Sequence, residues 1–549
     1  MKSPITPERR CHPSSKLWLA LAAAALVNTA HGFEIDTNNP DLKLRWDNTV
    51  RYSAAARLKE RLPSLAGTVI GASGIVGPNN INQDDGDNNF NRGLVSSRVD
   101  VLSEIDLAYG NFGARVTGAA WYDQIYNRST DNTTRTNNHT PASEFTREAR
   151  EIMGRKAELL DAFVYGRFNL GATPATIRLG RHTLLWGESL FYGANGISGG
   201  MAPIDIVKAS SVPNSQFKEI VRPTGKLSGQ VQISPSVTAG GYLPYDWEKS
   251  RLPPAGAYLN AIDPGGPGGE ALRVGSRTLT RAPDLDAKKS GQGGVQVRVR
   301  ADSVDTDFGF YAIRFHALTP SNVIFNGAPP TTATQYRFLH HEGISVYGAS
   351  AARTIAEWSL AGELSMRKNM PLASASQVSP GFQLNNNSNP GYAVGDTAHA
   401  QFSWLASLGP SLIANEASFV GEIAWNTRLK FTQNERMANP NASRSATGMR
   451  TAYTPTYRQV ISGLDLSPSV GVGYTLGKSS ALGSGFGVHR GGDLNIGLGA
   501  VYLGVWNMNL NYVHYFGSVG GTNDNAGNAQ YRQALKDRNY VSLSLRTTF

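Results

Sequence analysis

Hydrophobic and polar residues alternate with a period of two along much of the chain. Across 42–58 most apolar residues occupy even positions and the charged residues occupy odd positions. An α-helix would mix the two sets around its surface, whereas a β-strand places one set on each face. Segments 98–109 and 112–123 repeat the pattern, and Gly110-Asn111 between them is a two-residue hairpin connection. These segments therefore predict antiparallel strands.

The links between the predicted strands alternate in length. A short link follows every second strand, as at Ser234-Pro235-Ser236, Ser467-Pro468 and Leu503-Gly504, and a long link follows nearly every other strand, as at 124–158 and 244–293. An up-and-down barrel has this layout, because all short links then lie at one rim and all long links at the other. The 18 predicted strands are 42–58, 98–109, 112–123, 159–168, 175–182, 227–233, 237–243, 294–301, 308–316, 343–351, 357–367, 398–408, 417–426, 456–466, 469–476, 493–502, 505–515 and 540–549.

Two further features favour a barrel in the outer membrane of a Gram-negative bacterium. Aromatic residues cluster near strand ends, as at Tyr109 and Phe112, where rings occupy the headgroup level of a bilayer. The last strand ends in Phe549, which resembles the signal read by the barrel assembly machinery. We therefore expect an all-β fold: a transmembrane antiparallel up-and-down β-barrel of about 18 strands, in the range of about 14–18, with long extracellular loops and short periplasmic turns.

The composition of the chain agrees with this fold class. Of its 549 residues, 40% are hydrophobic and 17% are charged. Both shares lie below the roughly 45–50% and 25% of soluble domains, which argues against a large soluble enzyme. No run of 18 apolar residues follows residue 32, so the sequence excludes a helical membrane protein.

Residues 1–32 have the layout of a secretory signal peptide. A basic start precedes the apolar run 17–27, and Ala30-His31-Gly32 places small residues before a cleavage site. The single cysteine, Cys11, lies in this segment, so we expect 33–549 to form one barrel domain without a disulfide. The net charge of +10 suits outer-membrane lipid and lipopolysaccharide as partners, and we expect no nucleic-acid partner.

Three blocks of the sequence resemble a known family. They span 33–53, 85–127 and 177–225, and the third contains IRLGRHTLLWGESLFYGANGISGGMAPIDIVK and QFKEIVRPTG. The chain resembles a proteobacterial outer-membrane β-barrel family catalogued as a domain of unknown function. Members of this family resemble porin-like channels encoded near breakdown pathways for sterols, terpenes or aromatics, or near export machinery. The resemblance implies transport and names no substrate.

Motifs for catalysis, phosphate binding and metal binding are missing or incomplete. His340-His341 is an isolated pair, whereas metal sites use three or four ligands. The run Asp84-Asp85-Gly86-Asp87 lacks the glutamate that closes an EF-hand, so a solvated loop is favoured over a calcium site. We therefore expect no enzyme activity, no cofactor and no metal. An outer-membrane hydrolase stays open as an alternative, because three histidines lie on predicted strands: His182, His399 and His514.

Charged residues on the predicted inward faces make the barrel interior the first candidate site. Strand 42–58 is mainly basic, strand 98–109 is acidic and strand 112–123 carries both signs. Facing rows of opposite sign set a field across a pore and tune its selectivity. Alternatively, the charges pair across strands with little net gain. The pore candidates on these strands are Arg45, Arg51, Asp100, Glu104, Asp106 and Arg115.

The third long link, 183–226, is more apolar than the other links. Left in water it would form a sticky patch, so we expect it to fold into the barrel and narrow the pore. A loop that packs over the barrel mouth or against a neighbouring subunit is the alternative. A mostly apolar solute path needs a few polar anchors. The constriction candidates in this link are Trp186, Glu188, Asp205, Lys208 and Arg222.

The sequence thus predicts an outer-membrane channel for passive or facilitated passage of small solutes. A closed barrel of about 16–18 strands leaves an aqueous channel unless it is filled. Apolar, aromatic and steroid-like compounds are among the candidate solutes. An outer-membrane hydrolase of the lipase or protease type and a component of an export or surface-assembly complex are the alternatives.

Overall fold

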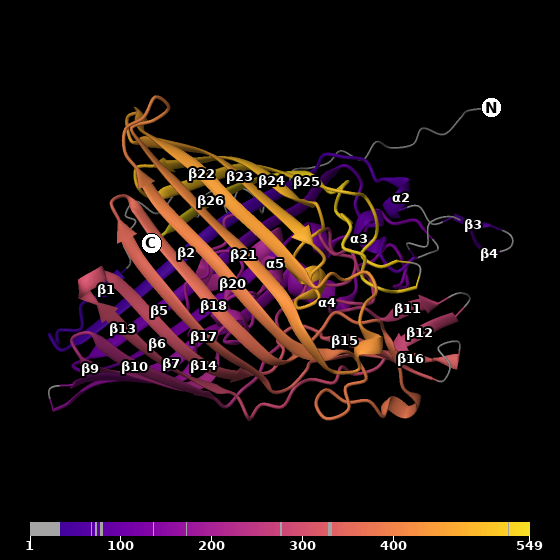
Figure 1. Cartoon of the computed structure of the whole chain (residues 1–549). Helices are drawn as coiled ribbons and strands as arrows, with labels where there is room; N and C mark the ends of the chain where they lie inside the picture. The colour runs from indigo at the N-terminus through magenta and orange to yellow at the C-terminus, as the bar shows by residue number, and fades with distance from the viewer. Residues whose placement is uncertain are drawn as a thin grey trace, which may run out of the picture.

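Strands that are neighbours in the chain pair edge to edge and close into a ring of 18 antiparallel strands in the computed structural model of the protein (Figure 1). The ring closes where the last strand pairs with the first, from Thr49 opposite Thr548 to Arg57 opposite Tyr540. The structure describes residues 33–66, 69–71, 74–76, 81–134, 137–171, 173–274, 277–327, 332–524 and 526–549. The predicted signal peptide, 1–32, lies outside the described residues.

Every barrel strand overlaps at least one predicted strand, which agrees with the predicted fold class, and the closed barrel of 18 strands confirms it. The barrel strands are β2 (Leu42–Arg57), β5 (Gly93–Tyr109), β6 (Phe112–Asp123), β7 (Arg155–Leu170), β8 (Thr173–His182), β9 (Thr224–Ser234), β10 (Val237–Pro244), β13 (Gly293–Ala301), β14 (Thr306–Phe315), β17 (Ile344–Ile355), β18 (Trp358–Pro371), β20 (Val394–Leu408), β21 (Glu416–Gln433), β22 (Ser445–Ile461), β23 (Leu464–Gly477), β24 (Gly491–Tyr502), β25 (Trp506–Phe516) and β26 (Tyr540–Thr548).

Shorter elements precede the ring or lie in its links. β1 (Phe33–Ile35) extends the sheet by pairing with the start of β2. The other short strands are β3 (Val69–Gly71), β4 (Gly74–Val76), β11 (Ala271–Val274), β12 (Arg277–Arg281), β15 (Asn322–Asn326), β16 (Gln335–Leu339) and β19 (Gln377–Val378). The helical turns are α2 (Pro63–Ala66), α3 (Asp85–Asn88), η1 (Ile125–Asn127), α4 (Arg147–Ala149), η2 (Arg150–Gly154), η3 (Ile197–Gly200), α5 (Ile206–Ser211), α6 (Phe217–Ile220), η4 (Asp302–Val304), η6 (Pro380–Phe382), η7 (Glu435–Met437) and η8 (Gly483–Phe486).

The predicted turn at Ser467-Pro468 is wrong. β22 and β23 meet instead at Ser462-Gly463, where the glycine has a φ of +78° that side chains rarely adopt. Pro468 lies inside β23 opposite Pro455 of β22, at a point where the paired residues of the two strands are interrupted. Neither proline has an N–H to donate, so the ladder loses little by placing them face to face. A proline inside a central strand is unusual, which is why the sequence pattern favoured a turn.

The long links gather at one rim of the barrel, where Figure 1 shows α2, α3, β11, β12, β15 and β16, and the short turns lie at the other. We number these long links in chain order as L1 to L9. They are L1 (58–92), L2 (124–154), L3 (183–223), L4 (245–292), L5 (316–343), L6 (372–393), L7 (434–444), L8 (478–490) and L9 (517–539).

The outer face of the ring is apolar and its inner face carries the charges. On β5, Val101 and Ile105 are exposed on the outside, whereas the preceding residues Asp100 and Glu104 are buried on the inside. Only a closed barrel satisfies all backbone groups of strands in lipid, and an apolar band on its outer face suits the bilayer. The protein is therefore a β-barrel of the bacterial outer membrane. Among the described residues, no helix is long and apolar enough to cross a bilayer.

The two rims are expected to face opposite sides of the membrane. Cysteine at Ser388 in L6 should react with an impermeant maleimide on intact cells, and cysteine at Asn111 should react only after the outer membrane is opened. Both positions are exposed, and the chain has no cysteine beyond Cys11. Labelling at Asn111 but not at Ser388 in intact cells would contradict this orientation. Asn138, in the long link 124–158, is a poor reporter because it is buried.

Candidate functional site

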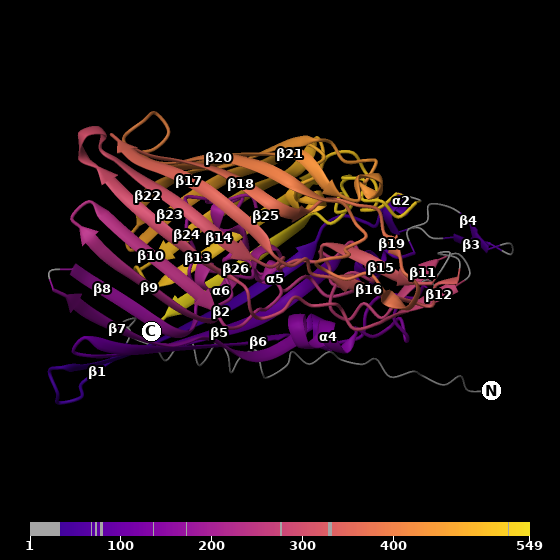
Figure 2. The same ribbon diagram turned by 60° about the horizontal axis from the view of Figure 1, so that its bottom comes forward.

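L3 joins β8 to β9, but its contacts reach across the barrel. Its residues form hydrogen bonds or ion pairs with side chains of β2, β5 and β7 on one side and of β18, β20 and β21 on the other. α5 of L3 lies within the ring of strands in both views (Figures 1 and 2). β9 begins at Thr224, so the last residues of the expected link, 224–226, belong to that strand. A constricting role for L3 stays a prediction.

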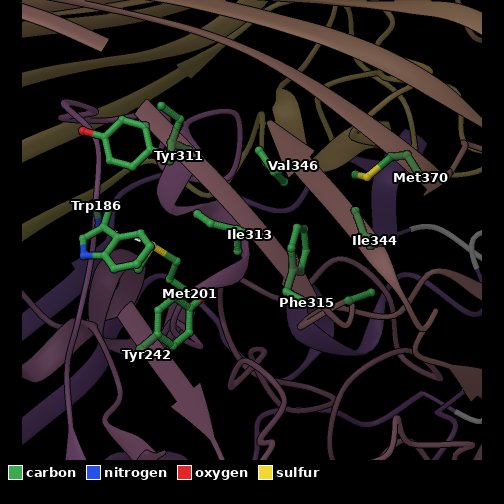
Figure 3. Packing of buried hydrophobic residues seen from close by; sticks show 11 residues of the cluster. Trp186, Met201, Tyr242, Tyr311, Ile313, Phe315, Ile344, Val346 and Met370 are labelled. Atoms are coloured by element: carbon green, nitrogen blue, oxygen red, sulfur yellow. Dashed lines mark hydrogen bonds between the residues drawn. The ribbon is translucent and has the colours of Figure 1, made fainter. Parts of the chain in front are cut away.

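The first half of L3 packs in an apolar cluster against the wall. The Trp186 ring meets Tyr242 of β10 edge to face, with ring centroids 5.0 Å apart. Ile197 and Met201 are buried in the same cluster, which Figure 3 shows together with Phe315 of β14 and neighbouring residues. Each fully buried side chain of this size contributes roughly 1.5–3 kcal/mol, so the cluster favours keeping this half of L3 inside.

Buried charges on the same wall hold the backbone of L3. Glu363 of β18 accepts hydrogen bonds from the backbone N–H of Glu188 and, at 2.9 Å, from that of Ile197. Glu422 of β21 accepts one from the N–H of Tyr192 at 2.8 Å. Arg367 of β18 donates to three consecutive carbonyls, at residues 194–196, over 2.8–2.9 Å. Hydrogen bonds to charged groups are stronger than neutral ones, so these residues fix the path of the loop.

The second half of L3 meets the opposite wall through a buried charge cluster. Arg51 of β2 donates to Glu219 of α6 at 2.9 Å and lies 3.3 Å from Asp100 of β5. Lys208 of α5 donates to Glu219 at 3.0 Å and lies 3.7 Å from Asp100. Arg98 also pairs with Asp100, at 2.8 Å. Three cations therefore share two carboxylates, and removal of one partner from such a buried cluster costs about 3–5 kcal/mol.

Trp121 of β6 stands at the centre of the basic residues. The guanidinium of Arg98, the ammonium of Lys208 and the guanidinium of Arg251 lie 4.8, 5.1 and 5.6 Å from its ring centroid. The negative face of an indole attracts cations, by about 2 kcal/mol or more where water is excluded. The Trp121 ring therefore gathers cations from three parts of the chain: β5, L3 and L4.

A second ion-pair group connects L3 to L4. Glu158 of β7 pairs with Arg222 of L3 at 3.2 Å and with Arg251 of L4. Arg251 also pairs with Asp205 at 2.7 Å, and Asp205 caps the first turn of α5. These ion pairs attach L3 both to β7 of the barrel wall and to L4.

The remaining strand candidates form separate pairs closer to the short-turn rim. Arg115 pairs with Asp106 at 2.6 Å, and Arg45 pairs with Asp47 of its own strand at 2.8 Å. Glu104 accepts a hydrogen bond from a lysine of α6. Of these contacts, Arg115–Asp106 joins two strands, Arg45–Asp47 lies within one strand, and Glu104 is joined to L3.

The predicted site residues fall into four places. The buried cluster contains Arg51, Asp100 and Lys208, with Glu104 beside it. The second ion-pair group contains Asp205 and Arg222, which are joined through Arg251 and Glu158. The opposite wall is contacted by Trp186 and Glu188, and separate pairs elsewhere contain Arg45, Asp106 and Arg115.

Sequence reasoning missed several residues that hold L3, above all Trp121, Glu158, Glu363 and Glu422. Glu158 fell outside the expected strand, because β7 begins at Arg155 rather than at 159. The other three stand at inward positions of β6, β18 and β21, and the period-two count offers a signal for each. The loop atoms that meet them could not be deduced from that count.

A cavity of about 270 Å³ lies between L3 and the wall formed by β24, β25 and β26. L3 contacts the walls near β2–β7 and β18–β21, and this cavity lies on another side of it. Asn511 of β25 and Ser542 of β26 face the cavity, and Asn507 and Asn509 have the same strand parity as Asn511. The cavity is lined by Lys208, Ala209, Ser210, Val212, Pro213, Asn214, Ser215, Ile220, Asn495, Asn511, Val513, Tyr540 and Ser542.

One Ser-His pair bears on the hydrolase alternative. Nε2 of His182 lies 2.7 Å from Oγ of Ser228, but Nδ1 faces the carbonyl of Gly180 at 3.1 Å. A catalytic triad places a carboxylate at this second ring nitrogen. Both side chains are also buried. The pair therefore holds β8 against β9.

The acidic run of L1 is buried, so the expectation of a solvated loop is wrong. Asp84, Asp85 and Asp87 are each at most 4% exposed. Three other loops cover them. Asn138 of L2 donates a hydrogen bond to Asp85, and Asp263 of L4 accepts one from the N–H of Asp84. Arg538 of L9 forms an ion pair with Asp87. Carboxylates from L1 and L4 meet there.

Comparison with known proteins gives one family and several solved structures. A family model described as a protein of unknown function, DUF1302, matches residues 14–549, which confirms the resemblance carried by the three sequence blocks. The chain is similar to the outer membrane channel DcaP of Acinetobacter baumannii, at 8% identity, 94% coverage of this chain, 99% of that chain and a TM-score of 0.38. For OccAB1 of Acinetobacter baumannii the values are 11%, 95%, 98% and 0.42. For a BenF-like porin from Pseudomonas fluorescens Pf-5 they are 10%, 92%, 98% and 0.41. No curated protein matches the chain.

Proposed function

The chain belongs to the DUF1302 family, whose description assigns no function, and we propose that it is a channel through which small solutes cross the outer membrane. The observation that carries the proposal is the cavity of about 270 Å³ between L3 and the β24–β26 wall. A barrel of about 18 strands is wide enough for an aqueous lumen unless side chains or loops fill it. Here L3 fills one part of the lumen and leaves a polar gap beside it.

The lining of this gap favours small amphipathic solutes. Asn495, Asn511 and Ser542 offer neutral hydrogen-bonding groups, and Val513 and Ile220 offer apolar surface. The one charged group of the lining, Lys208, is engaged by two carboxylates, Asp100 and Glu219. Apolar surface with few polar groups suits compounds with an apolar body and a polar edge, aromatic compounds among them.

The proposal predicts a strong difference between two neighbouring residues of β25. Asn511 faces the cavity, whereas Leu510 is exposed on the outer face. Asn511→Trp should lower the single-channel conductance in planar bilayers severalfold, because the indole fills the gap, and Leu510→Trp should leave it unchanged. Equal conductance of both variants and the parent protein would contradict a pore at this wall.

The same preparation tests the alternatives. A parent protein that inserts as a folded barrel but conducts no ions, and that co-purifies with export proteins, would favour the export component. Turnover of lipid or ester substrates that is lost on Ser228→Ala would favour the hydrolase.

A further inference from the structure

Three buried carboxylates meet where external loops L1 and L4 touch. Asp84 and Asp85 stand at the start of α3 in L1, and Asp263 belongs to L4. One carboxylate oxygen of each lies within 4.8 Å of those of the other two. All three side chains are almost completely buried, at 0%, 4% and 0% exposure. Like charges this close and this deep repel one another unless something compensates them.

The neighbouring Asp87 shows what compensation looks like in this protein. It pairs with Arg57 at 2.7 Å and with Arg538 at 3.3 Å. By contrast, within the described part of the chain no basic side chain forms an ion pair with Asp85 or Asp263. Basic groups act on these two acids only at longer range, Arg273 on Asp85 and Arg538 on Asp263, whereas Asp87 has two direct partners.

One oxygen of each of these two carboxylates accepts hydrogen bonds and the other does not. Oδ2 of Asp85 accepts from the N–H of Asn138 at 3.0 Å, and Oδ2 of Asp263 accepts from the N–H groups of Asp84 and Asp85 at 3.0 and 3.3 Å. Oδ1 of Asp85 and Oδ1 of Asp263 are buried and find no donor among the described residues. An uncompensated buried carboxylate costs several kcal/mol, so these atoms point to a missing positive group.

The space beside these two carboxylates points the same way. A cavity of about 10 Å³ adjoins Asp85 and Asp263 and is flanked by Asn137 and Asn138. That volume is about what one water molecule or one ion occupies.

We propose that Asp84, Asp85 and Asp263 bind one Ca²⁺ ion, which ties L1 to L4 at the outer rim of the barrel. The donors are all oxygens and come from an irregular loop junction. Such a set suits calcium, which accepts variable geometry, better than magnesium, which demands a regular octahedron. Zinc and copper prefer nitrogen and sulfur ligands. Because Arg251 of L4 contacts Asp205 of L3, the ion also steadies the loops that border the lumen.

Calcium uptake by the full-length protein tests the site. The chain is refolded in non-ionic detergent without lipopolysaccharide, treated with EDTA and dialysed against ⁴⁵Ca²⁺. We expect one bound ion per chain with a Kd of about 10⁻⁴–10⁻³ M, the range of extracellular calcium modules. Calcium should also slow hydrogen exchange in 81–90 and 257–264, the segments on either side of the ion.

Two variants and one control distinguish this site from surface binding. Asp263→Asn and Asp85→Asn should weaken uptake by about tenfold or more and remove the calcium-dependent protection. Without calcium, both should exchange no faster than the parent, because the substitution relieves repulsion. Asp131→Asn, which removes an exposed carboxylate of L2, should bind as the parent does. No uptake by the parent at about 10 mM Ca²⁺, or uptake by a heat-modifiable Asp85→Asn or Asp263→Asn barrel equal to that of the parent, overturns the proposal.

Discussion

Deleting residues 540–549 is expected to abolish the folded barrel in the outer membrane. β26 pairs on one side with β25 and on the other with β2, so its loss leaves two open strand edges. The hydrocarbon core offers no water to satisfy them, and each unpaired backbone group costs several kcal/mol there. We expect no heat-modifiable band in outer-membrane fractions.

A matched control is deletion of 381–390, a segment of similar length in external loop L6. This deletion opens no barrel edge and should leave insertion intact. Phe549→Ala is a milder test of the C-terminal strand. The backbone of Phe549 forms two hydrogen bonds with the backbone of Asn48, and the substitution leaves both in place. A heat-modifiable barrel at parental levels after loss of 540–549 would refute the closure argument.

The strand layout could be predicted from the sequence because the lipid imposes a simple rule. Every second residue must face hydrocarbon, so apolar residues such as Val101 and Ile105 mark one face all around the ring. The turn at Ser462-Gly463 escaped prediction because two opposed prolines make a permitted exception to strand chemistry.

The candidate site could be predicted only in part. Arg51 and Asp100 lie on adjacent strands, so their meeting follows from register. Glu363 and Glu422 meet L3 from strands that are far from β8 in the ring, and no local pattern encodes that contact. The burial of Asp85 likewise depends on L2 and L4, which pack over it in space while lying far away in sequence.

Opening the lumen by removing its inner loop should produce the largest functional change. We expect deletion of 190–215, bridged by a short Gly-Ser linker, to raise single-channel conductance severalfold and to weaken selectivity. The deletion removes α5 and the segment held by Glu363, Glu422 and Arg367, and so it clears the space between the two walls that L3 now connects.

The deletion need not unfold the barrel, because the charged residues that lose their partners become exposed to water at the same time. Asp100 and Glu219 lose Lys208, and Glu363 loses the N–H of Ile197. Water enters the space and solvates these groups, so the cost of about 3–5 kcal/mol for an unpaired buried charge does not apply. Glu363→Ala with Glu422→Ala removes two anchors and leaves the loop in place; it should give a smaller and noisier increase. A correctly inserted deletion variant with unaltered conductance and ion selectivity would show that L3 does not constrict the pore, and the proposed roles of Trp186, Glu188 and Lys208 would fall with it.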